Sequence, residues 1–250
     1  VHTVGLVLWK IRRTFIDFPR EYQILVADDG STDQTAEVLE PYTSVLPLTV
    51  IRHAERKGYA ATVEELLKLA VERTDRPKRD CAVIMHADFS HGTEFLPDMV
   101  RRIESGADMV VADGVVEGEP SRGLRWVRRV APWLLRPAVR IPGVRDVVSG
   151  YAAFRLVTLR NAFRAHDGPL LTTDGWAANA ELFARAAAGA RRIETIDAVE
   201  RRDLRQRATR RDPWRTFREV WDARRRLRVP PPAVAPARRS TRRTPEEAAP

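Results

Sequence analysis

Short apolar runs alternate with longer amphipathic segments through the first half of the chain. The runs QILVA, LTVIR, CAVIMHA and DMVVA are rich in branched side chains and predict buried strands at residues 23–27, 48–52, 81–87 and 108–112. Apolar positions at helical spacing predict helices over residues 4–15, from residue 36, over 60–72 and over 95–105. This alternation predicts an α/β fold, with a mostly parallel sheet covered by helices on both faces.

Acidic groups follow two of these predicted strands directly. Asp28 and Asp29 come straight after QILVA, and His86 and Asp88 close the run CAVIMHAD. Ligands of open α/β sheets bind beyond the carboxyl ends of the strands. We therefore expect a binding site where these side chains meet.

The net charge of +9 is concentrated at one end of the chain. Residues 201–250 hold 16 arginines and six acidic residues, a net of +10, which leaves residues 1–200 at −1. Beyond residue 228 the sequence is rich in proline and charge and has no large apolar groups, which predicts disorder. We expect one domain over 1–228, ending in a basic helix at about 205–228, and a disordered tail over 229–250.

Cysteine usage and hydropathy limit the cellular setting. Cys81 is the single cysteine, so no internal disulfide can form and a reduced, cytoplasmic compartment is expected. No apolar run approaches the roughly 20 residues that a spanning helix needs. We therefore expect a soluble or peripheral protein.

The sequence VADDGSTDQT, residues 26–35, places two carboxylates, a glycine and small hydroxyl residues after a strand. Taken alone it predicts a tight turn, in which Asp33 could cap the next helix. In its setting of strand, turn and helix it resembles the V-D-D-G-S-T-D-x-T signature of family 2 glycosyltransferases. The resemblance implies a GT-A fold, and it implies that Asp28, Asp29 and Ser31 bind the nucleoside part of a nucleotide-sugar.

The sequence MHADFSHGTEFLPDM, residues 85–99, is similar to the metal-binding D-A-D-L-Q-H-P-P-E-x-L-P segment of the same family. Asp88 matches the second aspartate, and His86 stands where the first is expected. The resemblance implies that Asp88 and His86 hold Mn²⁺ or Mg²⁺, which would neutralise a diphosphate leaving group. Imidazole suits Mn²⁺ better than Mg²⁺, so metal use is expected to be altered, weakened or lost. Alternatively, His86 is a strand-end histidine bonded to backbone.

The sequence DVVSGYAAFR, residues 146–155, resembles the D-x-x-S-G-F-x-x-x-R segment that lines the acceptor side in this family. This implies acceptor-side roles for three residues, Ser149, Gly150 and Tyr151. Glu181 matches the E-L-x-x-R-A helix that follows, which implies an acceptor-side role for it too. Alternatively, Glu181 pairs with Arg185 one helical turn further on.

Residues 192–202 resemble the family's R-x-x-E-V-P-I-x-F-x-x-R segment, which implies that Arg202 holds a phosphate. Two departures from the family stand out. The G-S-R expected after the strand at 108–112 is absent, and Arg122 or Arg125 could substitute for its arginine. The strand ending in P-x-x-N-E with which family members open is not recognisable either, so we expect the first strand of the sheet to be missing.

Residues 121–145 contain seven arginines and no acid. Most of these arginines fall in one sector of a helical wheel, with leucines and valines opposite and two tryptophans near the boundary. That pattern is typical of a helix in an anionic membrane interface, although the apolar side could equally pack on the protein's own sheet. Pro132 and Pro137 predict two short helices. Residues 201–228 are a second basic and aromatic stretch.

Together these motifs resemble the dolichol-phosphate mannose synthase-like branch of the family. This implies transfer of a sugar, with inversion, from a UDP- or GDP-sugar to a polyprenyl phosphate at the inner face of the membrane, with Asp88 and Arg202 as catalytic residues. Asp174 or Glu181 would serve as a base only for a neutral hydroxyl acceptor. The alternatives are a sugar or small-molecule acceptor, or a non-catalytic nucleotide-sugar-binding protein. Nucleic acid is not expected as a partner, because the basic excess is confined to the end of the chain.

Overall fold

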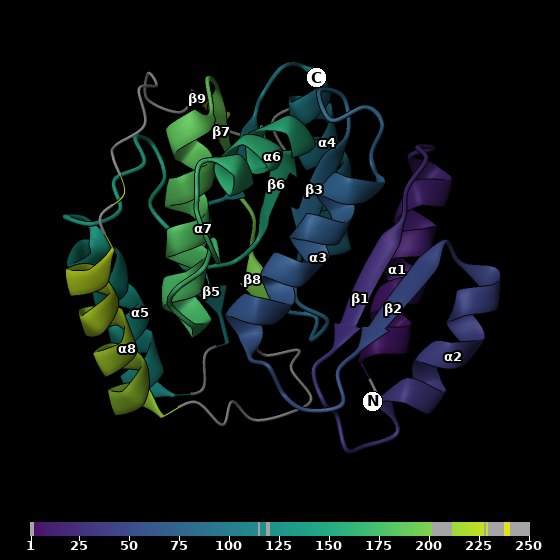
Figure 1. Ribbon diagram of the computed structural model, residues 1–250, viewed down its shortest axis with the longest axis horizontal. Helices are drawn as coiled ribbons and strands as arrows, with labels where there is room; N and C mark the ends of the chain where they lie inside the picture. The colour runs from purple at the N-terminus through teal and green to yellow at the C-terminus, as the bar shows by residue number, and fades with distance from the viewer. Residues whose placement is uncertain are drawn as a thin grey trace, which may run out of the picture.

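The computed structural model describes residues 3–114, 116–118, 121–201, 212–227, 229 and 238–240. Strands lie in the middle of the molecule and helices pack on both sides of them (Figure 1). The helices are α1 (Val4–Asp17), α2 (Thr35–Val45), α3 (Tyr59–Arg73), α4 (Leu96–Glu104), α5 (Arg122–Leu135), α6 (Leu156–Arg164), α7 (Gly175–Gly189) and α8 (Pro213–Arg226), with a 3-10 turn, η1, at Thr93–Phe95. The strands are β1 (Ile24–Asp28), β2 (Leu48–Arg52), β3 (Cys81–Ile84), β4 (Met109–Ala112), β5 (Val116–Glu117), β6 (Ala152–Arg155), β7 (Ile193–Ile196), β8 (Glu200–Arg201) and β9 (Arg238–Ser240).

The main sheet has the strand order β3-β6-β4-β7-β9. The pairs β4–β7 and β7–β9 are parallel, whereas β6 runs antiparallel to both of its neighbours, β3 and β4. Two further parallel pairs, β1–β2 and β5–β8, stand apart from this sheet. The predicted α/β fold with helices on both faces is confirmed, and the reversal of β6 makes the main sheet mixed.

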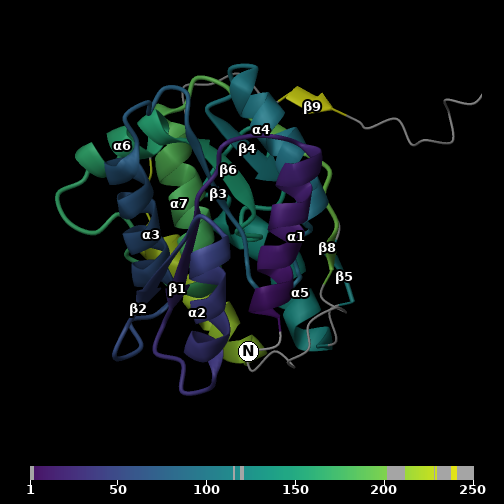
Figure 2. The same ribbon diagram turned by 90° about the vertical axis from the view of Figure 1, so that its right-hand side faces the viewer.

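Strand β4 shows why the sheet is covered on both faces. All four of its side chains are buried, and successive side chains of a strand point to opposite faces. Met109 and Val111 enter the cluster formed with α3, α5, α6 and α7, while Val110 and Ala112 enter the cluster formed with α1 and α4. Figure 2 shows α1 and α2 in front of the strands. Burying each large side chain of this strand contributes about 1.5–3 kcal/mol.

The strands are interrupted between β1 and β3. Among the described residues β1 pairs only with β2 and β3 only with β6, so each has one edge without a strand neighbour. The apolar side chains of β3 are only partly buried, in contrast to those of β4. In the described part of the chain the strands therefore form no continuous sheet from β1 to β3.

Helix α5 corrects the prediction of two short helices. It runs unbroken through Pro132, and the backbone N–H of Arg136 donates to the Pro132 carbonyl at 3.0 Å. Proline removes a single N–H donor, and the buried residues on both sides of it hold the helix against the core. Pro137 lies beyond the end of the helix. No helix in the described parts of the chain is long and apolar enough to cross a membrane.

The C-terminal region is described only in part. Helix α8 begins at Pro213, after the N-cap Asp212, whose carboxylate accepts the N–H of Trp214 at 2.9 Å, and it packs beside α5 (Figure 1). Within the range expected to be disordered, β9 pairs with β7. This pairing uses backbone hydrogen bonds alone, and the expected disorder of residues 229–250 stays a prediction. Arg202 lies outside the described residues.

Candidate active site

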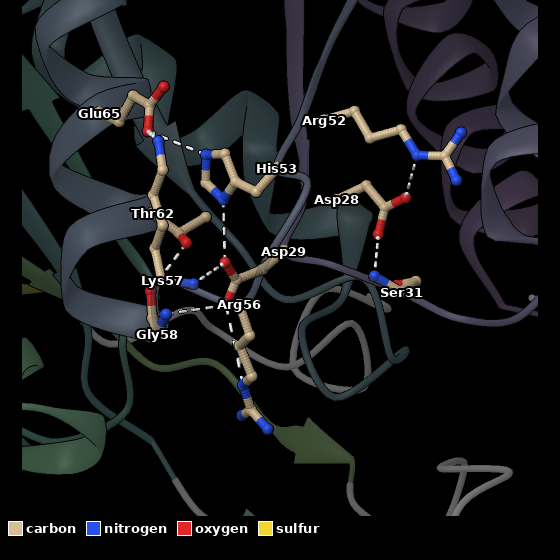
Figure 3. A network of polar contacts seen from close by, with 10 residues as sticks. All are labelled: Asp28, Asp29, Ser31, Arg52, His53, Arg56, Lys57, Gly58, Thr62 and Glu65. Carbon is tan, nitrogen blue, oxygen red and sulfur yellow. Dashed lines mark hydrogen bonds and ion pairs between the residues drawn. The ribbon is translucent and has the colours of Figure 1, made fainter.

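The first predicted motif forms the turn that leaves β1. Asp28 is buried, and its Oδ1 accepts the N–H of Ser31 at 3.0 Å. Its Oδ2 is buried without a hydrogen bond from any described residue and lies 3.8 Å from Nε of Arg52 (Figure 3). Gly30 has a φ of +67°, and a Cβ there would lie 2.9 Å from the Arg56 backbone nitrogen, so the turn requires glycine.

Asp29 organises the neighbouring loop. Its Oδ1 accepts the Lys57 N–H at 2.8 Å and lies 2.9 Å from Nδ1 of His53, and its Oδ2 accepts the Gly58 N–H at 3.0 Å (Figure 3). Burial raises the pKa of Asp29, but hydrogen bonds from His53, Lys57, Gly58 and Thr62 outweigh burial and leave the pKa lowered. Both carboxylate oxygens are therefore engaged within the protein. The geometry assigns Asp29 to holding the start of α3, while its predicted contact with a nucleoside stays a prediction.

His53 is a site residue that the sequence reasoning missed. Its buried ring lies between two carboxylates, with Nδ1 2.9 Å from Asp29 and Nε2 2.9 Å from Glu65, and Lys57 reaches the same Glu65 oxygen at 3.1 Å. Its position in the sequence could have identified it. His53 comes directly after β2, and ligands of α/β sheets bind beyond the carboxyl ends of the strands.

The second predicted motif forms the loop after β3. Asp88 is half-buried, and its Oδ1 accepts hydrogen bonds from the N–H and the hydroxyl of Ser90. Phe89 between them has a φ of +64°, a conformation that non-glycine residues seldom adopt. Such strain persists only where the surroundings fix it, and it is concentrated at functional sites. Here the strained turn fixes where the Asp88 carboxylate points.

His86 belongs to a chain of aromatic rings. Its ring stacks on Tyr59 at 5.6 Å and lies 4.8 Å from the ring of His91, which in turn stacks on Tyr151 at 4.5 Å. The His86 backbone N–H donates to Nδ1 of His91 at 3.0 Å. Burial holds the pKa of His91 well below its usual range, so this ring is neutral.

Tyr59 connects the predicted motifs to one another. It follows Gly58, which binds Asp29, and its ring lies against His86. Its hydroxyl donates to Oδ1 of Asn179 at 2.7 Å, and Nδ2 of Asn179 donates to the Val148 carbonyl at 3.0 Å. The segments of Asp29, His86 and Ser149 therefore meet at the N-terminus of α3. The sequence did not single out Tyr59, because a tyrosine on a helix more often packs in the core or lies on the surface than joins two motifs.

The predicted acceptor-side residues lie inside the protein. Ser149 is buried and donates to the Ala112 carbonyl, and the buried Tyr151 hydroxyl donates to the Gly92 carbonyl at 2.6 Å. Gly150 has a φ of +74°, and a Cβ there would lie 2.6 Å from the amide nitrogen of Asn179. The Tyr151 hydroxyl thus supports the loop after β3, and the acceptor-side roles of Ser149, Gly150 and Tyr151 stay predictions.

Glu181 lies inside the protein as well. Its fully buried carboxylate accepts hydrogen bonds from the N–H and hydroxyl groups of Thr172 and Thr173 and from the guanidinium of Arg185. Burial raises its pKa, but these donors outweigh burial and leave the pKa lowered. The alternative of a pair with Arg185 is confirmed. Glu181 shapes the loop before Asp174, and its acceptor-side role stays a prediction.

Asp174 is exposed at the mouth of a cleft. Its Oδ1 accepts the Ala60 N–H at 3.1 Å, at the start of α3, and it lies beside Gly58. The cleft, about 930 Å³ in volume, lies between α3, the loop at residues 169–174 and α8. The chain thus presents an exposed carboxylate next to the Asp29 network.

A second set of charges, also missed in the sequence, lies at the ends of β4 and β8. The guanidinium of Arg128 is buried and contacts Asp146 at 2.6 Å and Glu200 at 2.5 Å. Asp113, directly after β4, accepts the N–H groups of Arg145 and Asp146 at 3.1 and 2.9 Å. These bonds fix the start of the Ser149 segment and the strand that leads to residue 202. Arg122 and Arg125, the proposed substitutes for the absent family arginine, lie exposed on α5.

Metal binding was predicted at Asp88 and His86. Within the part of the chain that the structure describes, no three histidine, cysteine or carboxylate side chains gather as a metal site would require. The segment after β3 carries one carboxylate, that of Asp88, and one imidazole, that of His86. A cation bound to a nucleotide diphosphate takes ligands from the phosphates and water as well. Because the set includes imidazole, it fits Mn²⁺ better than Mg²⁺.

Solved structures with the same arrangement of elements define the fold. The chain aligns with Staphylococcus aureus TarS 1–349 in complex with UDP-GlcNAc at a TM-score of 0.53 and 17% identity, covering 89% of this chain and 63% of that one. It aligns with a mannosyltransferase from Pyrobaculum calidifontis in complex with GDP-Man and Mn²⁺ at a TM-score of 0.52 and 19% identity, covering 87% and 58%. The fold is that of the GT-A glycosyltransferases.

Sequence comparison supplies the family. The model of Glycosyl transferase family 2 matches residues 3–163, and the chain belongs to that family. It is 30% identical over 139 residues to a dolichol-phosphate mannosyltransferase of Pyrococcus furiosus, covering 54% of this chain and 38% of that protein. It is 29% identical over 187 residues to an uncharacterized glycosyltransferase of Mycobacterium tuberculosis, covering 72% and 73%. The chain thus spans well under half of the Pyrococcus furiosus relative.

Proposed function

We propose that the protein transfers a sugar from a UDP- or GDP-sugar to a polyprenyl-type lipid phosphate, with inversion at the anomeric carbon. One observation supports this above the others: Tyr59 and Gly58 bring the segments of Asp29, His86 and Ser149 together at one end of α3. The family membership supports these segments as the sugar-nucleotide site, and the name of the Pyrococcus furiosus relative supports the lipid phosphate as acceptor.

On the donor side, Asp28 and Ser31 face the nucleoside in our proposal, and Asp29 holds the loop over it. The buried Oδ2 of Asp28, which has no hydrogen-bond partner among the residues that the structure describes, supports this assignment, because such an oxygen can accept a donor from a ligand. TarS was solved with UDP-GlcNAc and the Pyrobaculum calidifontis enzyme with GDP-Man, so both nucleotide classes stay candidates.

Asp88 and His86 would hold a divalent cation, most suitably Mn²⁺, at the diphosphate. When bound, the cation supplies positive charge that stabilises the departing nucleoside diphosphate. The strained turn at Phe89 keeps the Asp88 carboxylate in place for this role. The Pyrobaculum calidifontis mannosyltransferase was solved with Mn²⁺ beside its GDP-Man, which supports the choice of metal.

On the acceptor side, a phosphate is already an anion, so the attacking oxygen needs no strong base. In the proposal Arg202 positions this phosphate, which suits the two parallel donors of a guanidinium. Glu200, just upstream, is held by the buried Arg128, which supports a fixed start for this segment. We place the enzyme at the cytoplasmic surface of a membrane, where a lipid phosphate would be found.

The test is turnover of a panel of UDP- and GDP-sugars by the purified chain, with a polyprenyl phosphate in detergent and with Mn²⁺, Mg²⁺ or EDTA. We expect lipid-dependent release of one nucleoside diphosphate, strongest with Mn²⁺ and lost in Asp88→Ala. Binding of a sugar-nucleotide without release in any condition would contradict the proposal and leave a non-catalytic binding protein. Release that needs no lipid would point to the second candidate.

The second candidate keeps the donor and changes the acceptor to a sugar or small molecule with a neutral hydroxyl. The exposed Asp174 beside a cleft of about 930 Å³ favours it, because such an acceptor needs a base and a cleft of this size can hold a sugar. Asp174→Asn separates the two candidates. It would abolish transfer to a hydroxyl acceptor and leave transfer to a lipid phosphate largely intact.

A further inference from the structure

A cleft of about 370 Å³ lies between the end of α5 and α8, away from the residues of the candidate active site. We call it the arginine notch; it is lined by Trp133, Arg136, Pro137, Arg140 and Arg224. Its walls come from two separate elements, the turn that follows α5 and the last turn of α8. Three guanidiniums therefore converge on one small cleft.

None of the three arginines of the notch forms an ion pair with a carboxylate in the described part of the chain. Arg224 only lies over the ring of Trp221, at 5.4 Å. Arg128, on the same helix as Trp133, shows the opposite arrangement, because two carboxylates neutralise it. Like charges brought together without a counter-charge repel each other, which costs stability unless an anion binds between them.

The exposed face of α5 around the notch carries tryptophan. Trp133 is 68% exposed and Trp126 is 52% exposed, and because they are seven positions apart both lie on one side of the helix. They lie at the edge of the arginine sector, as the sequence pattern predicts, and both are exposed. Trp214 on α8 is 77% exposed and lies against Phe217, which also contacts Trp126.

The leucine and valine face of α5 is already used by the protein. Leu124, Val127, Leu134 and Leu135 are buried in the core, so this helix cannot insert its leucine side into a bilayer. Only the arginine and tryptophan face is left for a partner. That combination matches the membrane interface, where indole rings sit at the headgroup level and guanidiniums meet phosphate.

We propose that the arginine notch binds the phosphate of an anionic phospholipid headgroup, with Trp133 and Trp126 resting in the interface beside it. The proposal rests on the membrane-bound acceptor proposed above and assigns the surface that meets the membrane. Planar guanidiniums from two elements can bind one phosphate through several parallel N–H donors, which a diffuse basic surface cannot do. One bound headgroup would fix how α5 and α8 lie on the bilayer.

The experiment compares three triple variants of the full chain, each with the same loss of charge. The first removes the notch, Arg136→Gln, Arg140→Gln and Arg224→Gln. The second removes exposed arginines on the same helix, Arg122→Gln, Arg125→Gln and Arg129→Gln. The third removes exposed arginines of α1, α6 and the turn before β3, namely Arg12→Gln, Arg79→Gln and Arg164→Gln. Binding is measured by flotation with phosphatidylcholine vesicles that contain or lack phosphatidylglycerol.

Diffuse attraction to an anionic surface is worth roughly fivefold in affinity per arginine, whichever arginine near the surface is removed. The proposal predicts that the notch triple loses at least roughly tenfold more vesicle binding than the triple on the same helix, and that the third triple binds like the unaltered chain. Equal losses in the first two triples would overturn the notch as a site. Thermal unfolding of each variant confirms that the chain still folds.

Two further measurements identify the ligand. Inorganic phosphate in millimolar excess should leave vesicle binding unchanged; displacement at that concentration would show that the notch prefers a free phosphate and would overturn the lipid. Tighter binding of single-stranded DNA than of vesicles at the same salt, lost with the notch triple, would also overturn it. Transferase assays in detergent separate this proposal from the proposed function, since the notch triple should keep its turnover there. An unaltered chain that binds vesicles as expected but transfers no sugar would contradict only the proposed function.

Discussion

Around the carboxyl end of β1, at the right of Figure 1, Asp29 accepts two backbone N–H groups and contacts His53, so its charge is used within the protein. On the pair α5 and α8, at the left, the arginines of the notch have no carboxylate partner among the described residues. Helix α5 contains both situations, since Arg128 is paired and buried whereas its neighbour Arg129 is exposed. The comparison separates charges that hold the fold from charges available to a ligand.

Arg128→Met tests this comparison with the largest expected effect. The variant leaves Asp146 and Glu200 buried without their counter-charge, and such losses cost about 3–5 kcal/mol. We expect the melting temperature to fall by roughly 10 °C, measured by circular dichroism. Arg129→Met is the matched control and should leave it within about 1 °C. Equal shifts in the two variants would mean that the buried triad adds nothing to stability.

Asp88→Asn tests whether the carboxylate at the end of β3 acts on the ligand. We expect turnover to fall by on the order of a hundredfold with unchanged melting, because charge at the diphosphate is lost. His86→Asp should raise turnover with Mg²⁺ relative to Mn²⁺, since a carboxylate replaces imidazole. The control is Asp98→Asn on α4, whose carboxylate pairs with Arg102. A variant at Asp88 that keeps full turnover would remove this residue from the mechanism.

The lowered pKa of Glu181 leads to a prediction for how the free energy of unfolding depends on pH. Its pKa is lowered in the folded protein, so its contribution is fully present above the ordinary glutamate pKa of about 4.3 and is lost as the pH falls through the folded value. Urea unfolding from about pH 7 to pH 3 should show a smaller acid loss in Glu181→Gln than in the unaltered chain. The substitution should also cost about 1–3 kcal/mol at pH 7, because buried donors lose their acceptor. Glu40→Gln, on the exposed side of α2, should change neither result.

Tyr59→Phe carries the smallest expected effect. It removes the hydrogen bond to Asn179 and keeps the ring against His86, at a cost of about 0.5–1.5 kcal/mol in the free energy of unfolding. If Tyr59 holds the motifs in register, KM for the sugar-nucleotide should rise as well. Tyr22→Phe is the control, because Tyr22 only stacks on Phe15 in the described structure. A rise in KM of equal size in both variants would argue against a role for the Tyr59 hydroxyl.

The strand ends could be predicted because their signal is local. Branched apolar runs end at Asp28 and just before His86, and β1 and β3 end close to the predicted positions. Helix α5 was predicted less well. The sequence shows that Pro132 destabilises a helix, but it does not show that buried residues on either side of Pro132 hold the helix against the core. The buried leucine side of this helix, left open between membrane and core, was settled by its contacts with the sheet and α7.

Several hydrogen-bond partners of the site residues lie outside the sequence motifs, so the motifs alone do not predict them. Glu181 is enclosed by Thr172 and Thr173, and Tyr151 reaches back to Gly92, so both turned inward. Arg128 looked like one more arginine of a basic helix, yet its partner Glu200 lies far along the chain. Spacing identifies which segments carry chemistry, whereas burial decides which of their side chains can reach a ligand.

The interruption between β1 and β3 also bears on how the chain folds. The pair β1–β2 joins strands that are close in sequence, linked by α2 alone, whereas β3 pairs with β6 only after α4, β4 and α5 have been placed between them. Pairing of nearby segments closes short loops at low entropic cost, and distant pairing is slower. We expect β1, α2 and β2 to gain hydrogen-exchange protection early in refolding and the main sheet to gain it later. The residues of the proposed sugar-nucleotide site would thus meet last, when Tyr59 reaches His86 and Asn179.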